Sequence, residues 1–245
     1  DIQMAAPSLS KFEKFTKKYR VFDLPFLFDN IEAVDRFQRS ETGIKLKQAM
    51  VRRGLTGLAF WHNGMKQLSA NRPLILPADA EGLKFRVQSS DVLVAQFTTL
   101  GANPQKMAFK EVYGGLQTDV IDGQENTWSN IYGKKFFEVQ NGITETNHGV
   151  IDYLLVTSSE WWSSLDTGTR ERLQAIIDEV TEERNLESHR INLQNRENII
   201  ASGGVVRTLT AEQRAQWVSV LQPVWSKFEN DIGSNVIAAA ISAND

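Results

Sequence analysis

One long helical pattern constrains the fold of this chain more than any other feature. From about residue 166 to residue 202 the sequence is compatible with helix throughout, and Leu173, Ile176, Ile177 and Val180 form an apolar stripe at helical spacing. A helix of roughly 35 residues extends about 50 Å, because each residue rises about 1.5 Å, and this exceeds the width of one lobe. We therefore expect the helix to lie across two lobes.

Two long strands are predicted to carry the chain between those lobes. Residues 55–69 have the pattern of one unusually long strand, long enough to leave one sheet and enter another, and residues 147–157 form a second. Shorter strands are predicted at residues 106–109 and 120–123, between short helical stretches. This alternation predicts an α/β protein whose strands are mixed rather than wholly parallel.

A strand, a short turn and the start of a helix are predicted over residues 84–93. Arg86 points to the opposite face of the strand from its two apolar neighbours, and Ser89 or Ser90 can cap the helix that follows. The free N–H groups of a helix N-terminus beside a guanidinium group suit a carboxylate or a phosphate. The same segment is also compatible with an edge strand whose polar face is simply in contact with water.

The composition excludes several classes of protein. The 27 Lys and Arg residues stand against 30 Asp and Glu residues, and no basic stripe with interleaved aromatic residues occurs, so we expect no nucleic-acid partner. No apolar run approaches the roughly 20 residues that cross a bilayer, so we do not expect a membrane-embedded protein. The chain has no cysteine, which excludes disulfides and is compatible with an oxidising compartment.

No metal site or cofactor is predicted. The three histidines, His62, His148 and His189, have no zinc-binding spacing, and the glycine-rich phosphate-binding loops are absent from the sequence. Asp122 and Glu125 could act as general acid and base in a hydrolase or lyase, but no nucleophile accompanies them. We therefore favour a binding or structural use of these carboxylates.

Several strings taken together resemble the solute-binding proteins of TRAP transporters, most closely their DctP branch. They are Asn63–Gln67, Gly82–Val87, Gly115–Tyr132 and Thr146–His148. The resemblance extends over essentially the whole chain. It implies a two-lobed periplasmic-binding-protein clamshell that is a receptor and not an enzyme.

Each predicted lobe is built from two separate segments of the chain. Lobe I comprises residues 1–63 and 153–191, and lobe II comprises residues 64–152 and 192–245. Residues 1–7 alternate like a strand, and we expect this strand to come from the middle of a fold. Because relatives carry another strand and helix there, the resemblance implies that lobe I is incomplete at its N-terminus.

The resemblance also implies a ligand site. Arg86 would hold a ligand carboxylate with a two-pronged salt bridge, Asn126 would hydrogen-bond the same end, and Lys66 would meet a second acidic group. Alternatively, Arg86 could pair internally with Glu125, and Lys66 could be a solvated strand residue. Further side chains expected to line the pocket are Gln88, Ser89, Trp128, Asn147 and Ser8.

The implied function is that of a monomeric periplasmic receptor for an organic acid. The DctP branch suggests a C4-dicarboxylate that is delivered to the membrane permease subunits of a TRAP transporter. A receptor for a monocarboxylate or a uronate is the alternative, and a sensor subunit for a membrane kinase would use the same clamshell. Lys66 separates the first two, because only a dicarboxylate offers it a second carboxylate.

Overall fold

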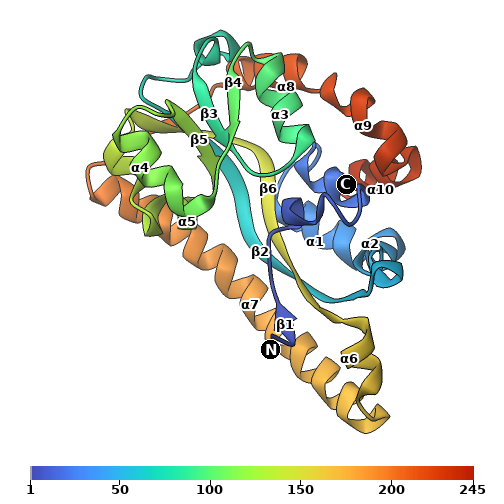
Figure 1. Ribbon diagram of the computed structural model, residues 1–245. Helices are drawn as coiled ribbons and strands as arrows, with labels where there is room; N and C mark the ends of the chain where they lie inside the picture. Colours follow the sequence, from blue (N-terminus) through green and yellow to red (C-terminus); the bar gives the residue numbers. More distant parts are fainter. Residues whose placement is uncertain (1) are drawn as a thin grey trace.

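A mixed seven-stranded sheet forms the centre of the protein, as the computed structural model of residues 2–245 shows (Figure 1). The strands follow the order β1-β6-β2-β5-β3-β4, and β7 pairs with β6. Strand β3 is parallel to β4 and β5, whereas β2 is antiparallel to β5 and β6, so the predicted mixture of directions is confirmed. The strands are β1 Met4–Ala5, β2 Leu55–Ala70, β3 Lys84–Val87, β4 Asn103–Lys106, β5 Gly123–Asn126, β6 Gly142–Ser158 and β7 Val206–Thr208.

Strands β2 and β6 are the two long crossing strands. They pair from Leu55 and Ser158 at one end to Ala70 and Gly142 at the other, with three shifts of register. The first predicted long strand is confirmed, and the second begins earlier than predicted because β6 continues past a bulge to pair with the end of β2. Both remain in one continuous sheet, which differs from the predicted passage between two sheets.

The N-terminal segment joins this sheet through β6. Strand β1 pairs with β6, and Ser8 forms an isolated bridge to Tyr153. The strand predicted over residues 1–7 is therefore shorter than expected, and Asp1 lies outside the described residues. The 3₁₀ turn Leu9–Phe12 that follows is held against the middle of β6.

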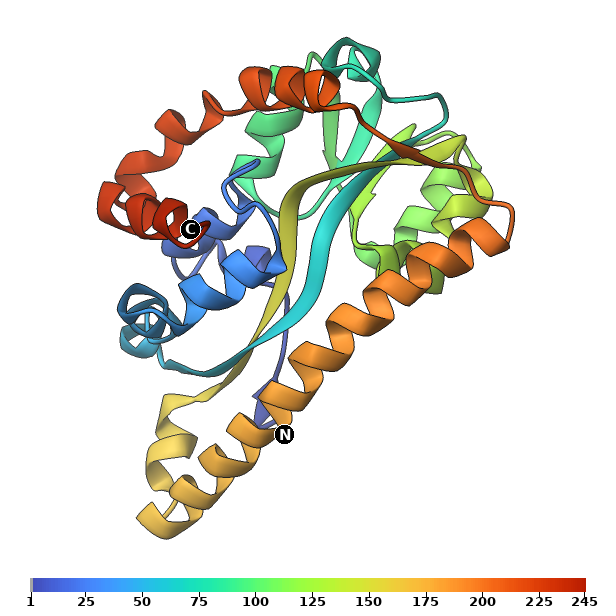
Figure 2. The ribbon, with the colours of Figure 1, turned by 180° about the vertical axis from the view of Figure 1, so that it is seen from behind.

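Helix α7, Thr167–Ala201, confirms the predicted long helix with 35 residues. Figure 2 shows it running diagonally along β2, from α6 to α5. Its N-cap is Asp166, whose side chain accepts a hydrogen bond from the Thr169 N–H at 3.0 Å. The predicted apolar stripe is only partly buried, since Ile177 is buried but Ile176 is 56% exposed.

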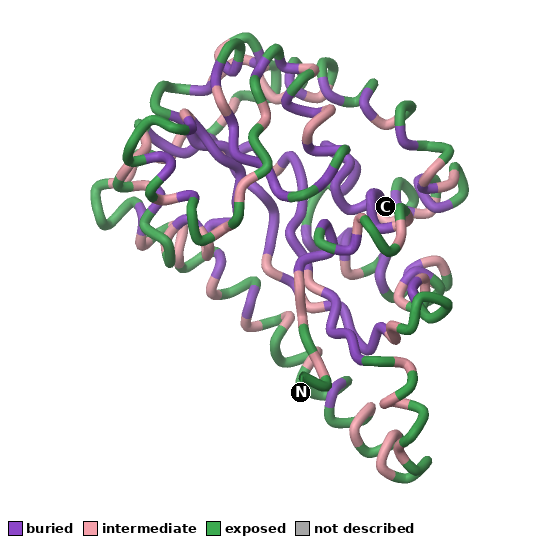
Figure 3. Tube along the Cα trace, viewed as in Figure 1, coloured by how far each residue is buried: buried purple, intermediate pink, exposed green. Residues whose placement is uncertain are grey.

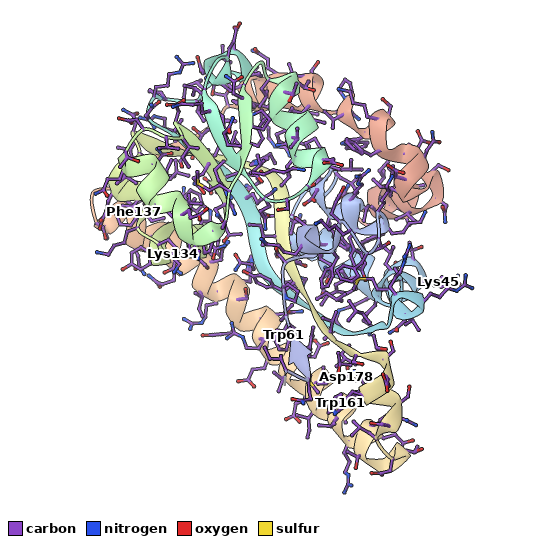
Figure 4. The ribbon with its side chains drawn as sticks, in the orientation of Figure 1. Lys45, Trp61, Lys134, Phe137, Trp161 and Asp178 are labelled. Carbon is purple, nitrogen blue, oxygen red and sulfur yellow. The ribbon has the colours of Figure 1, made fainter. Side chains whose placement is uncertain are left out.

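Polar side chains attach α7 to the crossing strand β2. Asn185 accepts a hydrogen bond from the His62 N–H at 2.9 Å, and the Ser188 hydroxyl donates to the His62 carbonyl at 2.7 Å. The register of β2 against β6 shifts at this point, so these bonds satisfy backbone groups that the strand pairing leaves free. Figure 4 shows Trp61 beside α7, where its indole N–H donates to Thr181 at 3.0 Å.

Two short strands lie elsewhere than predicted. Strand β5 occupies residues 123–126 rather than 120–123, and β4 occupies residues 103–106 rather than 106–109. All four residues of β5 are buried although three are polar, so a hydrophobic pattern could not locate it. The remaining helices are α1 Ile31–Arg39, α2 Glu41–Lys47, α3 Asp91–Thr99, α4 Val112–Gln117, α5 Trp128–Gly133, α6 Ser159–Ser164, α8 Ala211–Leu221, α9 Val224–Ile232 and α10 Ser234–Ser242.

Buried apolar side chains gather in separate clusters around the crossing strands. The largest joins residues from 9 to 60 with helices α9 and α10. Two others surround β3 with α3 and α4 with α5, and a small fourth cluster joins β2, β6 and α7. Figure 3 shows β2 and β6 buried along most of their length, whereas α7 is largely exposed. The predicted lobe boundaries stay a prediction; α9 and α10, which that prediction assigns to lobe II, pack in the same cluster as residues 9–60.

Candidate ligand-binding site

A small cavity lies where the N-terminal segment meets β3, β5 and β6. Its volume is about 110 Å³. Larger grooves of about 270 and 320 Å³ lie along α1 and α7, but the small cavity is the one that contains Arg86. It is lined by Ser8, Lys11, Arg86, Gln88, Phe109, Asn126, Asn130, Ile151 and Tyr153.

Arg86 is a buried cation with unused donors. Its side chain comes from β3 and is 2% exposed, and its Nε–H donates to the Met107 carbonyl at 3.0 Å. Within residues 2–245, Nη1 and Nη2 have no hydrogen-bond acceptor and no carboxylate within 4.0 Å. Burial lowers the pKa of Arg86, although the charge of Glu125 opposes this effect. A buried guanidinium group without a counter-ion is a strong site for an anion, because desolvation penalises it until a negative charge arrives.

The helix that follows β3 contributes less to this site than predicted. Ser90 caps α3 by accepting a hydrogen bond from the Leu93 N–H at 3.5 Å. Asp91 in the first turn forms ion pairs with Lys106 at 2.9 Å and with Arg20 at 3.0 Å, so this helix end already has a negative charge beside it. Neither Ser89 nor the first turn of α3 lines the cavity.

Asn126, Gln88 and Ser8 lie in the cavity with Arg86, as predicted. Asn126 is 1% exposed, and its Oδ1 accepts a hydrogen bond from Asn130 Nδ2 at 2.7 Å. Its own amide NH₂ donates to no acceptor in the part of the chain that the structure describes. Gln88 Nε2 donates to Ser8 Oγ at 2.9 Å. Thr127 caps α5, so Asn126 is not needed there and is available to a ligand.

Lys66 lies outside this cavity, in a buried ionic cluster. Its side chain is 0% exposed, and its Nζ lies 2.8 Å from Glu125 Oε1. The other oxygen of Glu125 lies 2.8 Å from His148 Nε2. Burial alone would raise the pKa of Glu125, but Lys66 and His148 lower it to about 2. Gly149 fits this cluster, because a Cβ there would lie 2.7 Å from Lys66 Cε.

Trp128 and Asn147 line a different cavity, of about 170 Å³, beside α7. Trp128 is 2% exposed, and the Arg196 guanidinium group lies over its ring, with 5.8 Å between Cζ and the ring centroid. Asn147 exchanges two hydrogen bonds with Gln67, at 2.6 and 3.0 Å, and has a φ of 45°. The structure thus brings four of the eight predicted ligand residues together, and Lys66, Ser89, Trp128 and Asn147 lie elsewhere.

Five residues of the cavity were not singled out from the sequence. Asn130 lies four residues after Asn126, in the first turn of α5, and Ile151 and Tyr153 share one face of β6, so spacing could have indicated these three. The Tyr153 hydroxyl accepts a hydrogen bond from Asn63 Nδ2 at 2.9 Å, and burial raises the pKa of Tyr153. Lys11 and Phe109 come from irregular segments without such a signal.

The carboxylates considered for catalysis are engaged elsewhere. Asp122 accepts hydrogen bonds from the Lys84 N–H at 2.7 Å and from Asn71 at 3.2 Å, and Glu125 belongs to the Lys66 cluster. Neither lines the cavity. Across residues 2–245, no group of three potential ligands could hold a metal ion, and no helix has the length and apolarity needed to cross a bilayer.

Comparison with known proteins identifies close relatives. The profile of the DctP family, described as bacterial extracellular solute-binding protein, family 7, matches residues 1–231. The C4-dicarboxylate-binding periplasmic protein DctP of Vibrio cholerae is 68% identical over 244 residues, which cover 100% of this chain and 74% of that protein.

Solved structures of related proteins have the same fold as this chain. A TRAP periplasmic solute-binding protein of Shewanella oneidensis with bound succinate is 52% identical with a TM-score of 0.98, over 100% of this chain and 81% of the other. One of Pseudomonas aeruginosa with bound L-malate is 47% identical with a TM-score of 0.90, over 92% and 79%. The predicted clamshell fold is confirmed, and the family description and relatives' names confirm the periplasmic location.

Proposed function

The chain belongs to family 7 of the bacterial extracellular solute-binding proteins, and we propose that it is a periplasmic receptor that binds a C4-dicarboxylate and delivers it to a TRAP permease. The observation that carries this proposal is the buried Arg86, whose two terminal nitrogens face the cavity without a protein acceptor among residues 2–245. The relatives named for C4-dicarboxylates, and those solved with succinate or L-malate, support the ligand class.

The Arg86 fork fits one carboxylate of the ligand. Nη1 and Nη2 match the two carboxylate oxygens in one plane, and guanidinium keeps its charge even when burial lowers its pKa. The Asn126 amide is a third donor on the same side of the cavity. Charge-assisted hydrogen bonds contribute about 1.5 to 3 kcal/mol each, so three of them are consistent with micromolar binding.

The lining residues come from opposite sides of the cavity. By the predicted boundaries, Ser8 belongs to lobe I, whereas Arg86 and Asn126, on the paired strands β3 and β5, belong to lobe II. Contacts from both sides reach full strength only when the lobes close on the ligand, so the ligand shifts the protein toward its closed form. A closed receptor is the form that a permease can distinguish from an empty one.

The same geometry argues against catalysis. The residues that line the cavity include no carboxylate and no histidine, the side chains that most often serve as a general base. We propose that the protein binds its ligand without converting it. Incubation with succinate followed by NMR should return the acid unchanged, and any product would count against this reading.

Lys66 keeps a place in the proposed site, as a positioning residue. Because it holds the Glu125 carboxylate, Glu125 does not turn toward Arg86 and occupy the fork that the ligand needs. Ser89, Trp128 and Asn147 stay predictions as ligand contacts. A receptor for a monocarboxylate or a uronate remains the alternative ligand class, since Arg86 recognises only one carboxylate.

Calorimetry and thermal shift with a panel of acids test the proposal. Succinate, malate and fumarate should stabilise the protein by about 2.7 kcal/mol at 100 times the dissociation constant, and monocarboxylates and uronates by less at equal concentration. Arg86→Ala should abolish the response, whereas the exposed Arg52→Ala should respond like the parent protein. A larger response to a uronate would favour the alternative, and an Arg86→Ala protein that binds normally would overturn the site.

A further inference from the structure

We propose that Lys11 binds the second carboxylate of the ligand and gives the site its preference for dicarboxylates. This inference rests on the proposed function, in which Arg86 holds the first carboxylate. It differs from the prediction for Lys66, which the resemblance had assigned to the second acidic group.

The charges around the cavity lead to Lys11. Arg86 and Lys11 are the cationic side chains among the residues that line it, and no acidic side chain lines it. A dianion that enters with one carboxylate on Arg86 therefore meets one further cation. The other polar groups of the lining, including Asn130 and Tyr153, are neutral donors that solvate a carboxylate without balancing its charge.

Lys66 is unsuited to the same task. Its ammonium group is completely buried and lies 2.8 Å from Glu125, so a ligand would have to compete with a buried carboxylate for it. A carboxylate that replaced Glu125 would leave the Glu125 charge without its nearest cation in the interior. Lys66 is also not among the lining residues.

The backbone around Lys11 is fixed while its ammonium group is free. Leu9 and Phe12 on the same 3₁₀ turn are 3% and 4% exposed, and the Lys11 N–H donates to the Ser8 carbonyl at 2.9 Å. Ser8 is in turn held by its bridge to Tyr153. Within residues 2–245, Lys11 forms no ion pair within 4.0 Å, although its side chain is exposed.

A free lysine at the rim suits a second carboxylate that arrives from the other lobe. The ammonium group is a compact charge on a flexible stem, so it can follow the far end of acids that differ in length or substitution. In the open form it stays hydrated at little cost. When the lobes close, water leaves the cavity and the attraction between the Lys11 ammonium group and the ligand becomes stronger. Lys11 therefore stabilises the closed form more when the ligand is a dianion than when it is a monoanion.

Succinate and its monoamide, succinamate, test this role because they have the same length and differ in one charge. Calorimetry on the parent protein should show tighter binding of succinate. Lys11→Met should weaken succinate binding about ten- to hundred-fold and leave succinamate binding within about two-fold, so that the preference disappears. Lys11→Arg should keep the preference, and Lys14→Met, at an exposed lysine outside the cavity, should bind both acids like the parent.

The outcomes separate this inference from the proposed function. If Lys11→Met keeps the parent preference while Arg86→Ala loses both acids, Lys11 is not the second cation and the receptor reading stands. If the parent protein does not distinguish the two acids, the second carboxylate has no cationic partner and the inference also fails. If Arg86→Ala binds succinate normally, the proposed function itself fails. Thermal unfolding of each ligand-free variant checks that the exposed substitutions leave the fold intact.

Discussion

Two buried cations on nearby strands have opposite surroundings. Lys66 on β2 is 0% exposed and lies 2.8 Å from Glu125, which His148 also contacts. Arg86 on β3 is 2% exposed, and within residues 2–245 its terminal nitrogens meet no carboxylate. Two equally buried cations can therefore have different roles. The charge of Lys66 is balanced by a carboxylate of the protein, whereas the charge of Arg86 is available to a carboxylate of the ligand.

A third buried cation resembles Lys66 rather than Arg86. His62 Nδ1 lies 2.7 Å from Asp152 Oδ2, and its Nε2 lies 3.3 Å from Asp35 Oδ1. Burial alone would lower the pKa of His62, but Asp152 and Asp35 raise it to about 10. This cluster connects both crossing strands to α1. As with Lys66, a buried cation paired with carboxylates of the protein holds separate elements together.

The largest expected effect on stability comes from breaking the Lys66 pair. Lys66→Met keeps much of the stem but leaves Glu125 buried without its nearest cation, which should lower the free energy of unfolding by about 3 to 5 kcal/mol. Urea denaturation at pH 7 measures the loss. The double variant Lys66→Met with Glu125→Gln removes both charges and should recover part of it. A loss below about 1 kcal/mol would mean that Lys66 is not the counter-ion that holds this cluster.

The His62 cluster should make stability depend on alkaline pH. The folded-state pKa of about 10 lies above the ordinary value of 6.5, so the contribution is complete below pH 6.5 and is lost as the pH rises toward 10. Urea midpoints should therefore fall from pH 6.5 to pH 9.5. His62→Gln should be less stable at pH 6.5 and show a flatter dependence over that range. An equal slope in both proteins would assign the pH dependence to other groups.

The elements that local patterns define were predictable. The long helix and the first crossing strand follow from periodicity, and Arg86 could be placed on a strand because its neighbours alternate. The motif around Asn126 identified the family, although its strand β5 escaped detection. A strand made of Gly, Gln, Glu and Asn is buried because other strands lie on both sides of it, and a local hydrophobic pattern cannot identify those strands.

The partners of the buried charges could not be predicted for the same reason. Lys66 and Glu125 are 59 residues apart and meet because β2 lies beside β5. The prediction that Lys66 contacts the ligand used the charge of Lys66 but could not include Glu125 as its neighbour. Lys11 reaches the cavity because Ser8 bridges to a strand more than a hundred positions away, which only the assembled sheet reveals.

Arg86 should show the reverse of the Lys66 behaviour. Arg86→Met removes a buried charge that lacks a protein counter-ion, and the relief should offset the lost charge-assisted hydrogen bond to the Met107 carbonyl, worth about 1.5 to 3 kcal/mol. We expect the unfolding free energy of the ligand-free protein to stay within about 1 kcal/mol of the parent value, while the stabilisation by succinate disappears. A loss as large as that of Lys66→Met would show that Arg86 is part of the architecture after all.

The smallest effect should come from an ion pair of similar length at the surface. Lys106 Nζ lies 2.9 Å from Asp91 Oδ1, but the two side chains are 46% and 56% exposed. Water and salt screen such a pair, and Arg20 also contacts Asp91, so Lys106→Ala should change the unfolding free energy by about 0.5 kcal/mol or less. Urea denaturation in low and high salt measures this difference, which should vanish at high salt. If Lys106→Ala cost as much as Lys66→Met, distance rather than burial would govern these pairs, and the contrast between Lys66 and Arg86 would lose its physical basis.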